Sequence, residues 1–232
     1  MGLGALEGIP VDAPPWRMSG MVYGALLNQR AALDALGTAA SQPPYKAAPR
    51  APVLYVKPRN TLNGPGCVVP VPADAPELEV GATLALLIGR ATCRVSERDA
   101  LDHVAGYTIV NDVSVPHDVF YRPSVRLKAR DGSCCIGPRV VPRALVPDPA
   151  ALGIRVFVDG RQVASGDNRA LVRPVARLLA DVTEFMTLQA GDILLVGVLP
   201  TRPRVRAGQS VAIEIDGIGR LENRFAAEAV VA

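Results

Sequence analysis

The amino-acid sequence predicts a β-rich α+β fold with a few short helices, and three observations support this prediction. Short apolar runs of strand length recur along the 232 residues. Glycine and proline number 21 each, which favours many turns over a helical bundle. Only one long segment has the apolar spacing of an amphipathic helix. Apolar residues make up 49% of the chain and charged residues 20%, which excludes a disordered chain.

The first elements follow from local signals. Residues 1–20 are predicted to form an extended N-terminal arm, and residues 21–232 a single domain. The segment Met21–Leu27 is a predicted strand. Asn28 is expected to cap a short helix that faces inward with its leucines and ends at Gly37.

The most apolar run is Thr83–Ile88, bounded by Gly81 and Gly89, and its length favours a buried strand. A β-hairpin is expected around the turn at Asp159 and Gly160. The other predicted strands span Val53–Val56, Gly106–Val113, Ile154–Val158, Arg161–Ala164, Ile193–Val198, Gln209–Ile215 and Arg220–Phe225.

Two further helices and one long loop complete the prediction. Ser96 and Asp99 form a capping-box pattern for a short helix over 96–102. Leu171–Phe185, with a proline in its first turn, carries the amphipathic pattern noted above. Residues 114–137 are expected to form a long irregular loop, and such loops are often functional.

Composition narrows the classes of function. The net charge is +3 and the basic residues are scattered, which argues against nucleic-acid binding. The four cysteines form no C-x-x-C pair, so a reduced, cytoplasmic protein is expected. With two histidines, a zinc site is not expected. No basic leader and no apolar run of membrane-spanning length is present, so neither a signal peptide nor a membrane span is expected.

The segment GYTIVNDVS, residues 106–114, is predicted to form a buried strand with the carboxylate of Asp112 at its end. A buried acid is costly unless it has a partner. The partner could be a divalent metal ion or the lysine at position 128, and a surface turn acid is the third alternative.

Several motifs together resemble the fumarylacetoacetate hydrolase family: KPRNTLNG, GATLALLIGR, GYTIVNDVS, KARDG and LQAGDILLVG. The resemblance extends from about Met21 to Glu222 and implies a mixed β-sandwich roll. The segments NDVSVPHDVFYRP and KARDGSCCIGP are similar to the isomerase/decarboxylase branch that acts in homoprotocatechuate breakdown. Within that branch they resemble the N-terminal half, which some bacteria make as a separate subunit.

The family resemblance implies a Mg²⁺ or Mn²⁺ ion held by an E-x-E pair on one strand and an aspartate on the next. Asp112 matches the aspartate. Glu77 and Glu79 form an E-x-E, but alignment on LALLIGR places the ligand positions at Gly81 and Thr83 instead. We therefore expect both glutamates to be out of register and solvated, and Asp112 to be a vestigial ligand held by a lysine.

Other site positions implied by the resemblance are either matched or lost. Lys128 matches a family lysine near the metal and is the candidate catalytic residue, which would neutralise a substrate carboxylate or keep Asp112 ionised. Arg122, Arg126 and Lys57 are candidate contacts for a dicarboxylate substrate. The family's proton-transferring histidine and glutamate fall on alanines 32 and 35, and its G-T-P turn reads GVL at 197–199. The lone loop histidine, 117, is expected to be structural.

Three functions remain open at this point. The first is a subunit with a decayed metal site that pairs with a sister chain bearing an intact one, the assembly being a dienedioate isomerase and tricarboxylate decarboxylase. The second is a self-sufficient Mg²⁺- or Mn²⁺-dependent isomerase, decarboxylase or C–C hydrolase. The third is a non-catalytic module that binds a small dicarboxylate. The chain is expected to form homo-oligomers or mixed assemblies.

Overall fold

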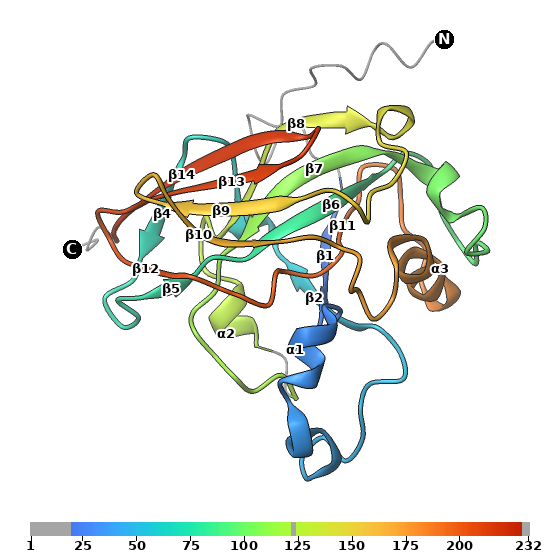
Figure 1. Ribbon diagram of the computed structural model, residues 1–232, viewed down its shortest axis with the longest axis horizontal. Helices are drawn as coiled ribbons and strands as arrows, with labels where there is room; N and C mark the ends of the chain where they lie inside the picture. Colours follow the sequence, from blue (N-terminus) through green and yellow to red (C-terminus); the bar gives the residue numbers. More distant parts are fainter. Residues whose placement is uncertain (1–19, 122–123, 229–232) are drawn as a thin grey trace.

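The computed structural model describes residues 20–121 and 124–228. All of the predicted N-terminal arm except Gly20 lies outside these ranges, as does Arg122. The described chain folds into two main sheets with few short helices, which confirms the predicted β-rich α+β sandwich (Figure 1).

The larger sheet has seven strands in the order β2-β1-β11-β6-β7-β8-β3. Their bounds are β2 Val53–Lys57, β1 Val22–Leu26, β11 Ile193–Leu195, β6 Ala82–Ile88, β7 Val104–Asp112, β8 Cys134–Pro142 and β3 Leu62–Asn63. The second sheet has the order β10-β9-β13-β14-β4. Its strands are β10 Arg161–Gly166, β9 Ile154–Val158, β13 Ser210–Ile215, β14 Gly219–Ala227 and β4 Val68–Val71.

A two-stranded ribbon and the helices lie at the periphery of the sheets. The ribbon pairs β12, Arg204–Val205, with β5, Leu78–Glu79. The α-helices are α1 Arg30–Asp34, α2 Val125–Lys128 and α3 Val175–Phe185. Short 3₁₀ helices span Gly37–Ser41, Arg59–Thr61, Ala100–His103 and Arg143–Leu145. None of the helices in the described ranges is both long and apolar enough to cross a membrane.

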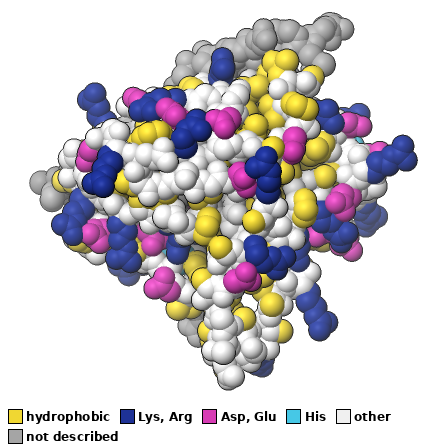
Figure 2. Space-filling view, viewed as in Figure 1, with side chains coloured by type: hydrophobic (Ala, Val, Ile, Leu, Met, Phe, Trp, Pro, Cys, Tyr) yellow, Lys and Arg dark blue, Asp and Glu magenta, His cyan; other side chains and the backbone are white. Residues whose placement is uncertain are grey.

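The core lies between the two sheets, and β6 is buried on both of its faces. Leu84 and Leu86 belong to the larger apolar cluster, whereas Ala85 belongs to a smaller cluster on the opposite face. Successive strand residues point to opposite faces, so a strand covered on both sides must be apolar throughout. This explains the uninterrupted TLALLI run. On the surface, acidic and basic side chains are interspersed over the face in Figure 2.

Most of the predicted elements are confirmed, with boundaries shifted by a few residues. The hairpin around the turn at 159–160 is formed by β9 and β10. The amphipathic helix is α3, which begins at Val175, directly after Pro174. Two predictions are wrong. The loop expected over 114–137 contains α2 and the start of β8, and the helix expected over 96–102 is a 3₁₀ helix at 100–103. The predicted contact between Ser96 and Asp99 does form.

The expected cap role of Asn28 is also wrong. Gln29, not Asn28, precedes α1, and no side chain caps that helix. The Asn28 amide instead joins three separate segments. Its Nδ2 donates to the backbone oxygens of Arg173 at 3.1 Å and Val196 at 2.8 Å, and its Oδ1 accepts from the Arg173 N–H at 3.0 Å. Asn28 thus fixes the end of β1 to the segments that precede α3 and follow β11.

This geometry predicts that Asn28→Asp is as destabilising as Asn28→Ala. Either change leaves the partly buried Arg173 carbonyl oxygen and the buried Val196 carbonyl oxygen without their donor, at a cost of about 1–3 kcal/mol in the free energy of unfolding. Aspartate caps helices as well as asparagine does, so a capping residue would tolerate Asn28→Asp. Denaturant unfolding of both variants makes the comparison. Wild-type stability of Asn28→Asp would contradict the bridging role.

Candidate functional site

Asp112 is the last residue of β7 and one of few carboxylates that the fold buries. β7 lies between β6 and β8, and the Asp112 N–H donates to the Gly81 carbonyl of the neighbouring chain segment at 2.9 Å. The side chain has no exposed surface. A carboxylate in this position requires compensating charge and hydrogen bonds.

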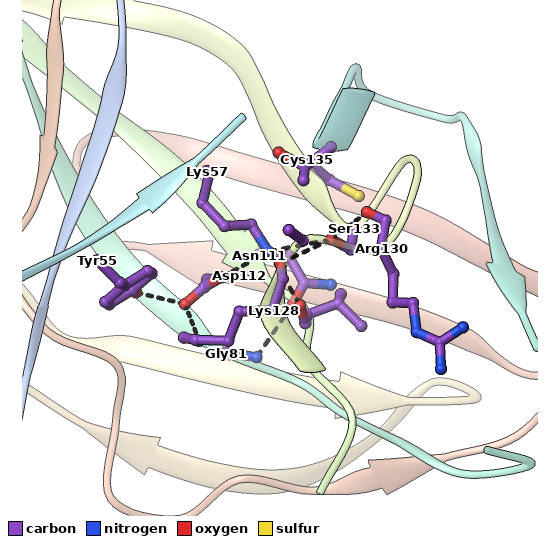
Figure 3. Close-up of polar contacts among 12 residues, drawn as sticks. Tyr55, Lys57, Gly81, Asn111, Asp112, Lys128, Arg130, Ser133 and Cys135 are labelled. Carbon is purple, nitrogen blue, oxygen red and sulfur yellow. Dashed lines mark hydrogen bonds and ion pairs between the residues drawn. The ribbon is translucent and has the colours of Figure 1, made fainter. Parts of the chain in front are cut away.

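Two lysines and a tyrosine surround the Asp112 carboxylate (Figure 3). The Lys57 Nζ lies 3.0 Å from Oδ1, and the Lys128 Nζ lies 2.8 Å from Oδ2. The Tyr55 hydroxyl donates to Oδ2 at 2.5 Å. Tyr55 and Lys57 are two residues apart on β2, and Lys128 is the last residue of α2. Each carboxylate oxygen therefore forms an ion pair with a lysine, and Oδ2 also accepts two hydrogen bonds, whereas Oδ1 accepts none from the described residues.

The two lysines differ in how fully they are enclosed. The Lys57 ammonium also donates to the carbonyl oxygens of Val113 at 3.2 Å and Lys128 at 2.5 Å, and to the Ser133 hydroxyl at 3.0 Å. The Lys128 ammonium has Asp112 as its one hydrogen-bond acceptor among the described residues, and it lies 4.3 Å from the centre of the tyrosine ring. Lys57 is thus fully satisfied, whereas Lys128 retains unused N–H donors.

Charge keeps Asp112 ionised despite its burial. Burial alone would raise the pKa of Asp112, but the positive charges of Lys128 and Lys57 outweigh it and hold this pKa far below its usual value. Burial lowers the pKa of Lys128, and the charge of Asp112 opposes that shift. Burial and the nearby carboxylate raise the pKa of Tyr55 well above 10, so its hydroxyl stays a neutral donor.

The two positions that correspond to the expected E-x-E pair carry no ligand. Gly81 lies opposite Asp112, and a Cβ built on it would lie 2.2 Å from the Asp112 carbonyl oxygen. Thr83 is buried, and its hydroxyl donates to the carbonyl oxygens of Leu84 and Gly197, both at 3.0 Å. The backbone has therefore closed over the space that the first glutamate would need.

Glu77 and Glu79 are separated by the structure. Glu77 pairs with Arg206 at 2.6 Å outside the site, and that arginine lowers its pKa. Glu79 is 5% exposed, so the prediction that both glutamates are solvated is wrong for this residue. Its backbone forms an antiparallel β-bridge with Ser114, and its carboxylate forms an ion pair with Arg202 at 2.6 Å. Ser114 lies two residues after Asp112, and residues two apart in an extended segment point to the same face. Glu79, which pairs with Ser114, therefore lies on the same face as Asp112.

The residues present do not fit the Mg²⁺ or Mn²⁺ ion that the family resemblance implies. Hard divalent ions need several free oxygen ligands. Each oxygen of Asp112 forms an ion pair with an ammonium group, and the Glu79 carboxylate forms one with Arg202, although Asp112 Oδ1 and Glu79 Oε2 accept no hydrogen bond from the described residues. Within residues 20–121 and 124–228, no group of three or more histidine, cysteine or acidic side chains is gathered closely enough to hold a metal ion.

A pocket of about 330 Å³ opens beside this cluster. One end is polar and is lined by Tyr55, Glu79, Asp112, Lys128 and Arg202. The other walls are largely apolar and come from the end of β1, α1 and the segment after β11: Ala25, Leu26, Ala32, Ala35, Val198 and Leu199. Such a pocket suits a small organic anion with a short apolar body.

The other predicted site residues are placed as follows. Arg126 is mostly exposed and pairs with Asp74 at 3.2 Å, away from this pocket. Lys57 does not line the pocket, and its enclosed ammonium does not agree with the expected substrate contact. Arg122 lies outside the described residues. His117 lines the pocket, and its Nδ1 lies 2.8 Å from the Val115 carbonyl oxygen.

Sequence reasoning missed Tyr55 and Arg202. The signal for Tyr55 was present, because residues 55 and 57 share one face of a strand if that strand continues to Lys57. The predicted strand ended one residue too early. Arg202 follows β11 in an irregular segment. No local sequence pattern distinguishes it from the other 24 lysines and arginines of the chain.

Comparisons with known proteins agree with this architecture. The family model described as "Fumarylacetoacetate (FAA) hydrolase C-terminal" matches residues 21–226. The 4-hydroxyphenylacetate degradation bifunctional isomerase/decarboxylase of Escherichia coli is 39% identical over 206 residues, which are 89% of this chain and 47% of that protein. The chain thus spans about half the length of this curated relative.

Two solved structures extend the comparison. The 5-carboxymethyl-2-hydroxymuconate delta-isomerase of Mycobacterium smegmatis superposes with a TM-score of 0.76 at 28% identity, covering 91% of this chain and 80% of that one. A maleylpyruvate hydrolase from Sphingobium sp. SYK-6, in complex with manganese(II) and pyruvate, gives a TM-score of 0.74 at 27% identity, covering 90% and 71%. From the match over residues 21–226 and this similarity, the chain belongs to the fumarylacetoacetate hydrolase family.

Proposed function

We propose that the chain is one subunit of an assembly that isomerises 2-hydroxyhepta-2,4-diene-1,7-dioate and decarboxylates 5-oxopent-3-ene-1,2,5-tricarboxylate in 4-hydroxyphenylacetate catabolism. Its own metal site is degenerate, and a sister chain of the same family supplies an intact one. The observation that carries the proposal is the Asp112 carboxylate, which is neutralised by two ammonium groups where the family resemblance implies a metal ligand. The match to about half of the E. coli isomerase/decarboxylase supports the substrate assignment.

In this proposal the chemical step belongs to the sister chain. A divalent ion bound there would polarise the 2-oxo acid and stabilise the enolate that decarboxylation or tautomerisation generates. The present chain, with residues 21–232 as one domain, contributes its fold and its contact surface to the assembly. Its pocket carries alanines at 32 and 35, where the resemblance implies proton-transferring groups, and alanine cannot move a proton.

The two alternatives are less well supported. A self-sufficient metal enzyme would need Asp112 to leave both lysines and Glu79 to leave Arg202 before either could bind an ion. A module that only binds dicarboxylates would not explain the similarity to an isomerase/decarboxylase over 89% of the chain. A cytoplasmic location stays a prediction, based on the free cysteines 67, 93, 134 and 135.

Reconstitution tests the proposed function. The chain is purified alone and together with a co-expressed family member that carries an intact E-x-E motif. Each preparation is assayed with Mg²⁺ or Mn²⁺ for dienol tautomerisation and for CO₂ release. The lone chain should be inactive and the mixed assembly active. Turnover by the lone chain at the rate of the assembly would overturn the proposal.

A further inference from the structure

The two main sheets of the described chain have four edge strands, and three of them carry features that hinder pairing with a further strand. β3 is only two residues long. β4 contains Pro70, which has no backbone N–H to donate. β10 carries the exposed charge of Arg161 and a bulge between Gln162 and Ala164. These three strands are therefore poor templates for a strand of another chain.

The fourth edge strand, β2, has none of these features. Its sequence, VLYVK, contains no proline, and it pairs with β1 over all five residues without a bulge. Its one charged side chain, Lys57, is buried and pairs with Asp112. Among the described residues, no strand other than β1 pairs with β2, and no backbone hydrogen bond reaches Val53–Val56 from outside the sheet. The outer N–H and C=O groups of β2 can therefore accept a further strand.

Exposed apolar side chains lie beside this edge strand. Val56 is 41% exposed, Tyr121 54% and Val125 64%, and all three line one groove of about 410 Å³ next to β2. Within the described ranges no carboxylate lines this groove, and its one charged residue is Lys128, which pairs with Asp112. Large apolar side chains that are exposed together are typical of a surface that contacts another protein chain.

A second copy of this chain fits this surface. The side chains at positions 53–56 are all uncharged, so two β2 strands can lie antiparallel without placing like charges opposite each other. Lys57, the next charge along the strand, is neutralised inside its own copy. An antiparallel pair of identical strands has a two-fold axis, which is the commonest symmetry of soluble oligomers. The same axis brings the two apolar grooves together, so both are covered at once.

We propose that two copies of this chain form a symmetric dimer in which their β2 strands pair antiparallel and each copy covers the apolar groove of the other. The larger sheet then continues from one copy into the next, as it does when an extended segment is added to a sheet edge. The inference goes beyond the proposed function and does not rest on it. The contact joins two copies of this chain and leaves the other surfaces to the sister chain.

Sedimentation velocity of the purified chain over a range of concentrations tests this inference. The wild type should sediment as a dimer at micromolar concentration. Val56→Lys places like charges close together across the two-fold axis and should weaken dimerisation by about tenfold or more. Val163→Lys is the matched control, because Val163 is 42% exposed but lies on β10, the edge strand at the end of the other sheet. It should dimerise as the wild type does.

A second variant keeps the test decisive if Val56→Lys does not fold. Val125→Lys changes a more exposed residue on α2 that lines the same groove, and it should weaken the dimer in the same direction. A monomeric wild type would overturn the inference. So would a dimer that folded Val56→Lys and Val125→Lys leave unchanged, or one that Val163→Lys weakens equally.

Hydrogen exchange distinguishes strand pairing from a looser contact between the copies. The backbone amides of residues 53–56 that point away from β1 should be protected in the wild-type dimer and exchange faster in the monomeric variant. Equal exchange of these amides in the dimer and the monomer would rule out pairing through β2. None of these measurements involves turnover or the sister chain, so the inference and the proposed function can fail separately.

Discussion

Asp112→Asn is expected to lower the free energy of unfolding by about 3–5 kcal/mol, the typical cost of removing one partner of a buried ion pair. The substitution leaves the ammonium groups of Lys57 and Lys128 buried beside each other with a neutral amide between them. The Tyr55 hydroxyl also loses its charged acceptor. Guanidinium unfolding of the variant and the wild type measures the difference.

The matched control is Asp74→Asn. The Asp74 carboxylate also contacts two cations, Arg126 at 3.2 Å and Arg130 at 2.9 Å, but it lies at the exposed surface. Solvent screens such pairs, so this variant should unfold almost as the wild type does. If Asp112→Asn were no more destabilising than Asp74→Asn, the buried cluster would not contribute to the stability of the fold.

The lowered pKa of Asp112 makes the free energy of unfolding depend on pH. The lysine charges hold the pKa of Asp112 below its value in the unfolded chain, which is about 3.9 for a free aspartate. A lowered pKa contributes stability above the unfolded value, and that contribution is lost as the pH falls through the folded value. The stability difference between the wild type and Asp112→Asn should therefore be constant near neutral pH and shrink below about pH 4. A difference that grows on acidification would contradict the assignment.

Gly81→Ala is expected to destabilise the fold by about 1–3 kcal/mol, because it forces two strands apart. The added Cβ would lie 2.2 Å from the Asp112 carbonyl oxygen and 2.9 Å from its carbonyl carbon, and 3.1 Å from the Val198 Cγ1. Two of these atoms are backbone, so they cannot swing away as the end of a flexible side chain would. By the same reasoning, Gly81→Glu would not restore a metal ligand at this position.

Gly89→Ala is the control, because Gly89 follows the other end of β6. A Cβ there meets Ala105 atoms at 3.1–3.2 Å, which a shift of a few tenths of an ångström relieves. Thermal unfolding should show a clearly larger loss of stability for Gly81→Ala than for Gly89→Ala. Equal losses would mean that the strands near Asp112 are not packed as closely as the geometry indicates.

Most of the fold could be predicted from the sequence because its signals are local. The TLALLI run, the turn at 159–160 and the amphipathic pattern of α3 each lie within one element. β8 was missed because its sequence, CCIGPRVVP, contains the glycine and proline that predict a loop. The structure accommodates them with a register shift between β7 and β8, which depends on the partner strand.

The site was predictable only in part, for the same reason. The burial of Asp112 was predicted from its place at the end of an apolar strand, and its pairing with Lys128 from the family resemblance. The structure shows both the burial and the ion pair. The second lysine and Tyr55 come from β2, which is four strands away from β7 in the sheet order. Only the curvature of the sheet and the length of the side chains bring them to the carboxylate. No local sequence pattern indicates that side chains of β2 reach a carboxylate on β7.

Titration of the purified chain with Mn²⁺, after removal of bound metals with EDTA, tests most directly whether the Asp112 site has exchanged a divalent ion for lysine. The carboxylate is bound by Lys57 and Lys128, so calorimetry should detect no saturable Mn²⁺ binding in the wild type or in Asp112→Ala. Tight binding of one Mn²⁺ per chain that Asp112→Ala abolishes would show that the site is a working metal centre, and would contradict the account.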